Sequence, residues 1–190
     1  MIDLNKLNPE QKQAVLTTEG PLLILAGAGS GKTRVLTYRA AYLLEKGVPP
    51  WAILAITFTN KAAREMRERI NRLAGEAADD MWVMTFHALS ARILRRDIEK
   101  LGYKREFSIY DDDDQMTLIK RILKKLDISD KSYPPRAVKS VISDAKNHML
   151  SPEEWLKDNP DFRSKPYYRA YCEYEKELKE NNALDFDDLI

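Results

Sequence analysis

The segment that most constrains the fold of this chain lies at residues 21–33. It reads PLLILAGAGSGKT, an apolar run of strand length followed by a loop of small residues that closes on Gly-Lys-Thr. Residues 34–44 then carry the pattern of a helix. Strand, glycine-rich loop and helix in this order are the context in which a P-loop binds phosphate. Backbone N–H groups of such a loop form an anion-binding concavity, and the helix adds its positive end. The segment therefore predicts a nucleotide-phosphate site.

Individual roles follow from the chemistry of such a loop. The Lys32 ammonium is predicted to reach the β- and γ-phosphates, and the Thr33 hydroxyl to ligate Mg²⁺. These two residues are the candidate catalytic pair, and ATP and Mg²⁺ are the predicted cofactors. The loop and first helical turn are predicted to surround the phosphates, through Ala26, Gly27, Ala28, Gly29, Ser30, Gly31, Lys32, Thr33 and Arg34.

The loop departs from the stricter P-loop pattern at Ala26, where that pattern has glycine. Alanine does not adopt positive φ without strain, so Ala26 is predicted to be ordinary backbone at the end of the strand. The alternative is a glycine-rich turn between a core strand and a helix. We favour the phosphate site because Lys32 and Thr33 stand where phosphate chemistry needs them.

Length and composition narrow the class of protein. A chain of 190 residues suits one large domain or two small ones. It has no apolar run near 18 residues, so no membrane-spanning helix and no membrane partner are predicted. The N-terminus lacks the basic and apolar regions of a signal peptide, which favours the cytoplasm. Cys172 is the only cysteine, so no intrachain disulfide can form, and a helix-packing thiol is favoured over a nucleophile.

Charge is distributed unevenly along the chain. Residues 1–110 carry 17 Lys and Arg against 12 Asp and Glu, a net charge of +5, whereas residues 111–190 carry 14 against 18, a net charge of −4. A basic first half suggests a polyanion-binding site there. Scattered solvated charge is the alternative that this pattern alone leaves open.

Hydrophobic periodicity predicts two regions of different architecture. In the first, strands at 22–26, 53–58 and 82–86 alternate with helices at 8–17, 32–46, 61–73 and 88–101, which predicts an α/β fold with a parallel sheet. A short last strand is predicted at 107–110. Beyond it only helices are predicted, at 112–126, 135–147, 151–157 and 166–181. The expected fold is a P-loop α/β domain with an all-helical second domain.

Two further strand ends are predicted to lie at the same sheet edge as the P-loop. One carries Thr57, Phe58, Thr59 and Asn60, and the other carries Thr85, Phe86 and His87. Ligands of open parallel sheets bind beyond the carboxyl ends of the strands. Hydroxyl and amide groups at helix starts suit phosphate oxygens, and aromatic rings suit unstacked bases. We therefore predict a single-stranded nucleic-acid surface there, with packing between sheet and helix as the alternative for each ring.

Basic side chains continue from these strand ends into the helices that follow. They are Lys61, Arg64 and Arg67 in one helix and Arg92, Arg95 and Arg96 in the other. A metal site at His87 is not expected, because His148 is the only other histidine and no Cys/His cluster exists.

Two acidic runs and a tyrosine stripe receive structural interpretations. Residues 111–114 are four aspartates, which we interpret as an N-cap and first-turn acids rather than as a metal cluster. Asp185, Asp187 and Asp188 are interpreted in the same way. Tyrosines at 167, 171 and 174 have helical spacing, which favours the core of a helix bundle over base stacking.

Four ordered motifs together resemble the N-terminal part of superfamily 1A DNA helicases of the UvrD/Rep/PcrA group, over essentially the whole chain. Residues 7–11 resemble the Q motif, which assigns adenine recognition to Gln11. Residues 26–33 resemble motif I, in which alanine at the first position is normal. Residues 53–63 resemble motif Ia, and residues 85–87 the next DNA-contacting motif. Residues 184–190 resemble the segment by which a helical insertion returns to the first RecA-like domain.

The resemblance implies a domain plan and an activity. Residues 1–110 would be part of the RecA-like ATP-binding domain 1A, residues 111–184 the helical insertion 1B, and residues 185–190 the start of the return to 1A, so the parallel sheet would be incomplete. The parent would be an ATP-dependent helicase, moving 3′ to 5′ on single-stranded DNA in repair or replication. The acidic Walker B motif and the second RecA-like domain are expected beyond Ile190, so residues 1–190 alone are expected to be inactive.

Two other functions were weighed against this one. A non-hydrolysing nucleotide-binding module, acting through partner contacts of its helical half, explains the P-loop equally well. A nucleoside or small-molecule kinase explains the P-loop but neither of the other two strand ends. An Asp-Glu pair on a downstream apolar strand would distinguish the helicase from the binding module.

Overall fold

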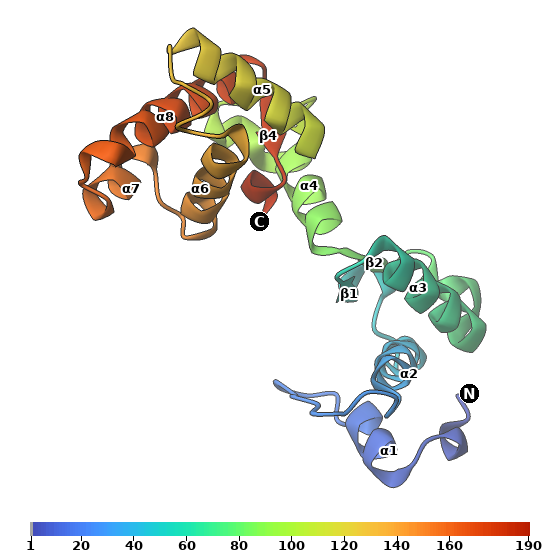
Figure 1. The fold of residues 1–190 in the computed structure, drawn as a ribbon. Coiled ribbons are helices and arrows are strands. Elements are labelled where there is room, and N and C mark those ends of the chain that lie inside the picture. The colour runs from blue at the N-terminus through green and yellow to red at the C-terminus, as the bar shows by residue number, and fades with distance from the viewer. Residues whose placement is uncertain (1) are drawn as a thin grey trace. The chain divides into compact units, whose positions relative to one another are not determined.

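A computed structural model describes residues 2–190 (Figure 1). The chain divides into two compact units, of which the first ends at Ala88 and the second spans Leu89–Ile190. Each unit is described by itself. None of the helices in residues 2–190 is long and apolar enough to span a membrane.

The first unit begins with a capped helix that the sequence predicted. After η1 (Leu4–Lys6), helix α1 (Pro9–Leu16) starts at the N-cap Asn8, with proline in its first turn. The Asn8 side chain accepts a hydrogen bond from the Gln11 N–H at 2.8 Å, and the Gln11 side chain accepts one from the Asn8 N–H at 3.2 Å. This reciprocal pair satisfies two N–H groups that a helix start otherwise leaves without partners.

The rest of the first unit consists of α2 (Lys32–Glu45), η2 (Pro50–Ala52), β1 (Leu54–Thr57), α3 (Asn60–Ala74), η3 (Gly75–Ala78) and β2 (Trp82–Thr85). Strands β1 and β2 pair in parallel, from Leu54 opposite Trp82 to Thr57 opposite Thr85. The predicted parallel pairing of these two strands is therefore confirmed. A buried cluster that includes Ile53, Met66, Ile70 and Val83 packs α3 against them.

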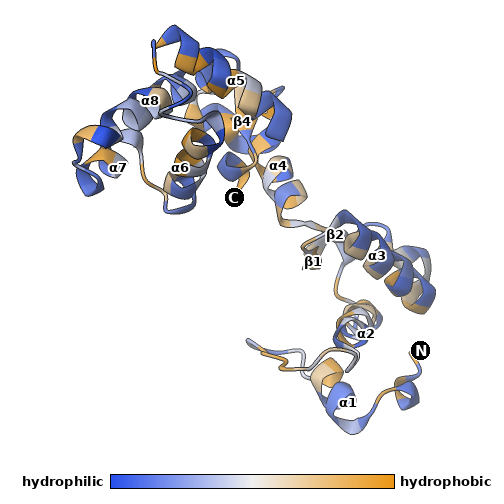
Figure 2. Cartoon of the chain, viewed as in Figure 1, coloured by the Kyte–Doolittle hydropathy of each residue, from blue (hydrophilic) through white to orange (hydrophobic). Residues whose placement is uncertain are grey.

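The predicted strand at 22–26 is wrong for this structure. Residues 21–27 form no helix or strand, and no segment of residues 2–190 pairs with them. Leu23 and Leu25 are 80% and 86% exposed, whereas Ile24 packs against the cluster of Leu7, Val15 and other residues. Figure 2 shows hydrophobic colouring on this coil between α1 and α2. A strand needs a ladder partner, and an apolar run without one stays an open coil.

The second unit contains most of α4 (Phe86–Asp97), which begins in the first, and then η4 (Ile98–Leu101), β3 (Ser108–Tyr110), α5 (Asp112–Lys125), α6 (Pro135–Asn147), α7 (Pro152–Asp158), η5 (Phe162–Ser164), α8 (Lys165–Glu180), β4 (Ala183–Asp185) and η6 (Asp187–Leu189). All four helices predicted beyond residue 111 are present. They pack on one another around a single buried cluster (Figure 1).

Strand β4 corrects the prediction that only helices follow residue 110. It pairs in parallel with β3, from Ser108 opposite Ala183 to Tyr110 opposite Asp185. Three residues carry too little alternation to show a strand in the sequence, and the pairing joins segments more than 70 residues apart. Because β3 pairs with β4, residues 108–110 lie in the helical unit. The domain boundary at residue 110 stays a prediction about the longer protein.

Two structural interpretations are confirmed within this unit. Asp111 is the N-cap of α5: its carboxylate accepts the N–H groups of Asp113 and Asp114, each at 2.9 Å. Tyr171 and Tyr174 of the predicted stripe lie in the core at 3% and 1% exposure, and Tyr167 packs at its edge.

Candidate nucleotide and nucleic-acid site

The loop at residues 27–31 forms a tight turn with two glycines in the left-handed region. Gly29 and Gly31 have φ values of +74° and +87°, which other residues adopt only with strain. The Ser30 N–H and hydroxyl both donate to the Gly27 carbonyl, at 3.4 and 2.7 Å, and close the turn. A Cβ at position 31 would lie 2.8 Å from Gln11 Nε2. The positive φ therefore favours glycine at position 31, and a larger residue there would also displace the end of the Gln11 side chain.

The Lys32 side chain folds back over this loop. Its Nζ donates to the carbonyls of Ala26 at 3.0 Å and Gly27 at 2.7 Å. The ammonium is thereby held above the exposed turn, where a phosphate group would meet it. Carbonyl contacts of this kind are replaceable, because a charged phosphate oxygen is a stronger acceptor than a neutral carbonyl.

Helix α2 presents an uncapped N-terminus directly after the turn. Its N-cap is Gly31, and no side chain supplies a cap hydrogen bond. The positive end of the helix therefore faces the loop. Thr33 and Arg34 are exposed in its first turn, where their side chains are accessible to a ligand. An exposed helix start beside a basic side chain is an arrangement that attracts an anion.

Gln11 connects helix α1 to the loop. Its Nε2 donates to the Ser30 carbonyl at 2.9 Å, while its Oε1 completes the cap of α1. The residue that the resemblance assigned to adenine thus lies beside the turn. Sequence reasoning missed Arg39 of α2, whose guanidinium donates to the carbonyls of Ala14 and Thr17 and fixes the chain between α1 and the loop. No sequence pattern distinguishes Arg39 from a solvated helix arginine.

A pocket of about 320 Å³ opens between α2 and α3. The Arg34 guanidinium lies 5.8 Å from the centre of the Tyr38 ring at its wall. Three arginines give the pocket a positive character. Its lining consists of Arg34, Thr37, Tyr38, Arg69, Arg72 and Leu73.

The other two strand ends bring an aromatic pair together. The rings of Phe58 and Phe86 lie 5.6 Å apart between centres and are inclined by 50°. Phe58 is 90% exposed and Phe86 is 41% exposed. The alternative for these rings was packing between sheet and helix. The exposure of Phe58 excludes that alternative for its ring. Adjacent parallel strands that end in register explain why two residues separated by 28 positions meet here.

The threonines of these strand ends shape the local backbone. Thr57 Oγ1 donates to the Thr59 carbonyl at 3.1 Å, and Thr59 Oγ1 caps α3 by accepting from the Ala62 N–H. Thr85 is buried and its Oγ1 accepts from the Ala88 N–H. Asn60 and His87 are exposed in the first turns of α3 and α4.

Several of the basic side chains predicted to continue from the strand ends contact the protein itself. Arg67 donates to the Val83 carbonyl at 3.0 Å and anchors α3 on β2. Arg95 lies over the Phe107 ring at 4.7 Å, and Arg96 pairs with Asp97 at 2.8 Å, although both remain exposed. Lys61 and Arg64 are exposed on α3. Of these five, Arg67 thus has a clear structural role.

No group of three or more His, Cys, Asp or Glu side chains in the described residues is arranged to hold a metal ion. Asp185 and Asp188 each donate a backbone N–H to the other's carboxylate, and both carboxylates contact Lys146. Asp187 and Asp188 lie in the first turn of η6 as interpreted, but the N-cap of η6 is Phe186 and Asp185 lies in β4, so the cap interpretation is wrong for Asp185. Lys146 was missed from the sequence because it is 39 residues away from Asp185.

The described chain thus combines a glycine-rich loop at a helix start, an exposed aromatic pair at neighbouring strand ends and a helical second unit. The UvrD/REP helicase N-terminal domain model matches residues 7–190, and the chain belongs to this family. The chain is similar to the ATP-dependent DNA helicase PcrA of Bacillus subtilis (strain 168), with 54% identity over 188 residues that cover 98% of this chain and 25% of that protein. PcrA of Staphylococcus aureus (strain Mu50) is 53% identical over 188 residues, which cover 98% of this chain and 26% of that protein. The chain spans about a quarter of the length of these relatives.

Proposed function

We propose that this chain is the N-terminal part of an ATP-dependent DNA helicase that moves 3′ to 5′ on single-stranded DNA. The family match and the PcrA relatives support the class of protein. The observation that carries the proposal at the residue scale is the Lys32 ammonium held over the turn of two positive-φ glycines, at an uncapped helix start.

In the nucleotide site, Lys32 would bind the β- and γ-phosphates in place of its two loop carbonyls. The N–H groups of the loop and of the first turn of α2 would surround the phosphates, and Thr33 would ligate Mg²⁺. Gln11 would border the adenine, as the family resemblance assigns, and Arg34 would lie near the phosphates; both lie beside Gly31. When bound, Mg-ATP supplies the phosphoryl group whose hydrolysis drives movement.

In the nucleic-acid site, the Phe58 and Phe86 rings would receive unstacked bases of single-stranded DNA. Their exposure and mutual inclination suit rings that accept bases rather than fill a core. Asn60 and His87 would contact the sugar-phosphate backbone from the first turns of α3 and α4. Thr57, Thr59 and Thr85 would position these groups through their local hydrogen bonds.

Hydrolysis and translocation are proposed to need the remainder of the helicase, including its Walker B motif and second RecA-like domain. Positioning and charge stabilisation account for most phosphoryl-transfer catalysis, so one part of a split site turns over little. The alternative is a non-hydrolysing nucleotide-binding module. DNA-stimulated ATP turnover of the chain extended to the length of its relatives, compared with residues 1–190, distinguishes the two.

The nucleotide site is tested by titrating a fluorescent ATP analogue with Mg²⁺ against the wild-type chain and Lys32→Ala. We expect at least tenfold weaker binding in the variant, because the phosphates lose a charge-assisted partner worth about 1.5–3 kcal/mol. Lys12→Ala removes an exposed lysine of α1 and serves as the matched control, with unchanged affinity. Equal affinity of the wild type and Lys32→Ala would remove the site assignment.

A further inference from the structure

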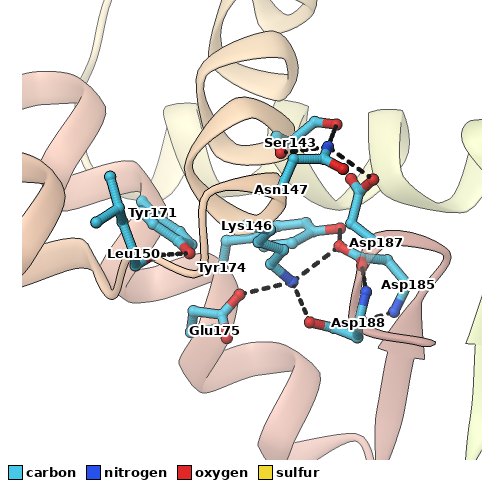
Figure 3. A network of polar contacts seen from close by, with 10 residues as sticks. All are labelled: Ser143, Lys146, Asn147, Leu150, Tyr171, Tyr174, Glu175, Asp185, Asp187 and Asp188. Atoms are coloured by element: carbon cyan, nitrogen blue, oxygen red, sulfur yellow. Dashed lines mark hydrogen bonds and ion pairs between the residues drawn. The ribbon is translucent and has the colours of Figure 1, made fainter. Parts of the chain in front are cut away.

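The ammonium of Lys146 is enclosed by carboxylates from different elements of the helical unit (Figure 3). Its Nζ, on α6, donates to Asp188 of η6 at 2.7 Å and to Asp185 of β4 at 2.9 Å, and lies 2.8 Å from Glu175 of α8. The Lys146 side chain is only 6% exposed and that of Asp185 only 1%. This group, Lys146 with Glu175, Asp185 and Asp188, is called the Lys146 cluster below.

The cluster holds the end of the described chain onto the helices. The Asp185 N–H donates to Asp188 Oδ2, and the Asp188 N–H donates to Asp185 Oδ1, both at 2.9 Å. Tyr174 of α8 adds a hydroxyl that donates to Asp185 Oδ2 at 2.9 Å. The return segment, defined here as residues 183–190, is thereby fixed to α6 and α8. Its Leu189 also packs in a cluster with Ile98.

The charges of the cluster do not balance, because three carboxylates surround one ammonium. Burying like charges together favours the neutral form of one carboxylic acid. Burial and the neighbouring Asp185 charge raise the pKa of Asp188 to about 6, although Lys146 opposes this. Burial also acts on Asp185, but the Lys146 charge and the hydrogen bonds of Asp185 hold its pKa below the ordinary value. As the pH falls toward 6, the pair therefore takes up a proton on Asp188 rather than on Asp185.

We propose that the Lys146 cluster is a proton-dependent latch, in which Asp188 takes up one proton and the return segment is held more firmly in that state. The latch is a property of the helical unit and does not depend on the proposed nucleotide or DNA sites. Its cause is geometric: three carboxylates share one ammonium in a largely buried position at the junction of four elements.

The direction of the pH effect follows from linkage. The closed state has the return segment on the helices, and the open state has it detached. Asp188 binds its proton more tightly in the closed state, so it stabilises that state fully at low pH. This stabilisation is lost as the pH rises toward and through 6. The closing equilibrium of the return segment should weaken about tenfold between pH 5 and pH 7. Lys146 stays charged throughout, since the surrounding carboxylates raise its pKa despite burial. The other titratable and charged groups that face Asp188 are Glu175, Tyr171 and Tyr174 of α8, Asp185 of β4 and Tyr103 before β3.

The direct test is a carbon-13 NMR titration of the Asp188 carboxyl in the whole chain. We expect a midpoint near pH 6. Amide hydrogen exchange of residues 183–189, corrected for intrinsic rates, is measured over the same range, and protection should fall about tenfold from pH 5 to pH 7. A midpoint of 4.5 or below, or protection independent of pH, would overturn the proposal.

Two variants separate the latch from other titrations. Asp188→Asn keeps the shape of the side chain without an ionisable group. In this variant the amide-exchange protection of residues 183–189 should be constant between pH 5 and pH 7. Glu173→Gln removes a carboxylate that pairs with Lys125 at 2.7 Å, and should keep the wild-type profile. His148 is present in the wild type and in both variants, so it does not account for a difference between their profiles. A wild-type profile in Asp188→Asn would contradict the proposal, and the NMR midpoint decides the question should that variant fail to fold.

Discussion

At the scale of single residues, the loop at residues 27–31 depends on neighbours that are close in sequence. Lys32 contacts carbonyls five and six positions earlier, and the Ser30 hydroxyl contacts the Gly27 carbonyl. Gln11 caps its own helix locally but also contacts Ser30, 19 positions away. The turn therefore follows from the local sequence, whereas phosphate binding by it stays a prediction.

Phe58 gives a prediction at this scale. Because its ring is 90% exposed, Phe58→Ala should leave the fold intact while removing a stacking partner for a base. We expect single-stranded DNA binding to weaken by about 1–3 kcal/mol. Fluorescence anisotropy with a labelled oligonucleotide at fixed salt measures the change, since phosphate contacts make affinity depend on salt.

The matched control for Phe58→Ala is Phe162→Ala, which removes another exposed ring, 77% exposed, from the helical unit. Its affinity for DNA should equal that of the wild type. If Phe58→Ala binds DNA as the wild type does, with an unchanged circular dichroism spectrum, the ring has no role in stacking.

At the scale of elements, strand pairing was the least predictable feature. Strands β1 and β2 were correctly expected, because each is an apolar run followed by a helix start. The run at 22–26 has an even stronger strand pattern, yet it has no ladder partner in residues 2–190. Strand β4 has hardly any pattern, yet β3 pairs with it. A strand is decided by its partner, and the partner is distant in sequence.

The unpaired segment 21–26 gives the element-scale prediction. Exposed apolar side chains beside unpaired backbone promote association between molecules. The double substitution Leu23→Lys, Leu25→Lys should therefore lower self-association of the chain without unfolding it, since both side chains point to solvent. Analytical ultracentrifugation over a concentration series provides the measurement.

Ile24→Lys is the contrasting control, because Ile24 packs against the cluster of Leu7, Val15, Val35 and Tyr38. A charge there should destabilise the first unit rather than improve its solubility. Should the double variant self-associate as strongly as the wild type, the association surface lies elsewhere.

At the scale of the whole molecule, the two units differ in how their cores are built. In the second unit, α5, α6, α7 and α8 share one buried cluster, extended by aromatic side chains. The buried residues of the first unit fall into two separate smaller clusters, and its sheet of β1 and β2 has only two strands. A two-stranded sheet contributes little stability by itself.

We therefore expect the helical unit to be the more stable part. Amide hydrogen exchange should show higher protection in α5, α6 and α8 than in β1, β2 and α3, because local opening costs less where fewer apolar contacts break. The exchange is measured by mass spectrometry on the monomeric chain. Uniform protection across both units in the monomer would show that the first unit is stabilised by contacts not seen here.

The sequence by itself determined the local features: the glycine-rich turn before α2, the helices α1 and α3, the capped start of α5, the helices of the second unit and the tyrosines of its core. Each depends on residues within a few positions of one another, so periodicity and capping chemistry suffice to show it. Only the tertiary structure decided that residues 22–26 stay a coil, that Phe58 and Phe86 meet, that Arg67 is engaged by β2, and that Lys146 lies among three carboxylates. These features depend on contacts between distant segments. Such contacts form only where the whole chain brings the partners together, so the sequence of either segment alone does not show them.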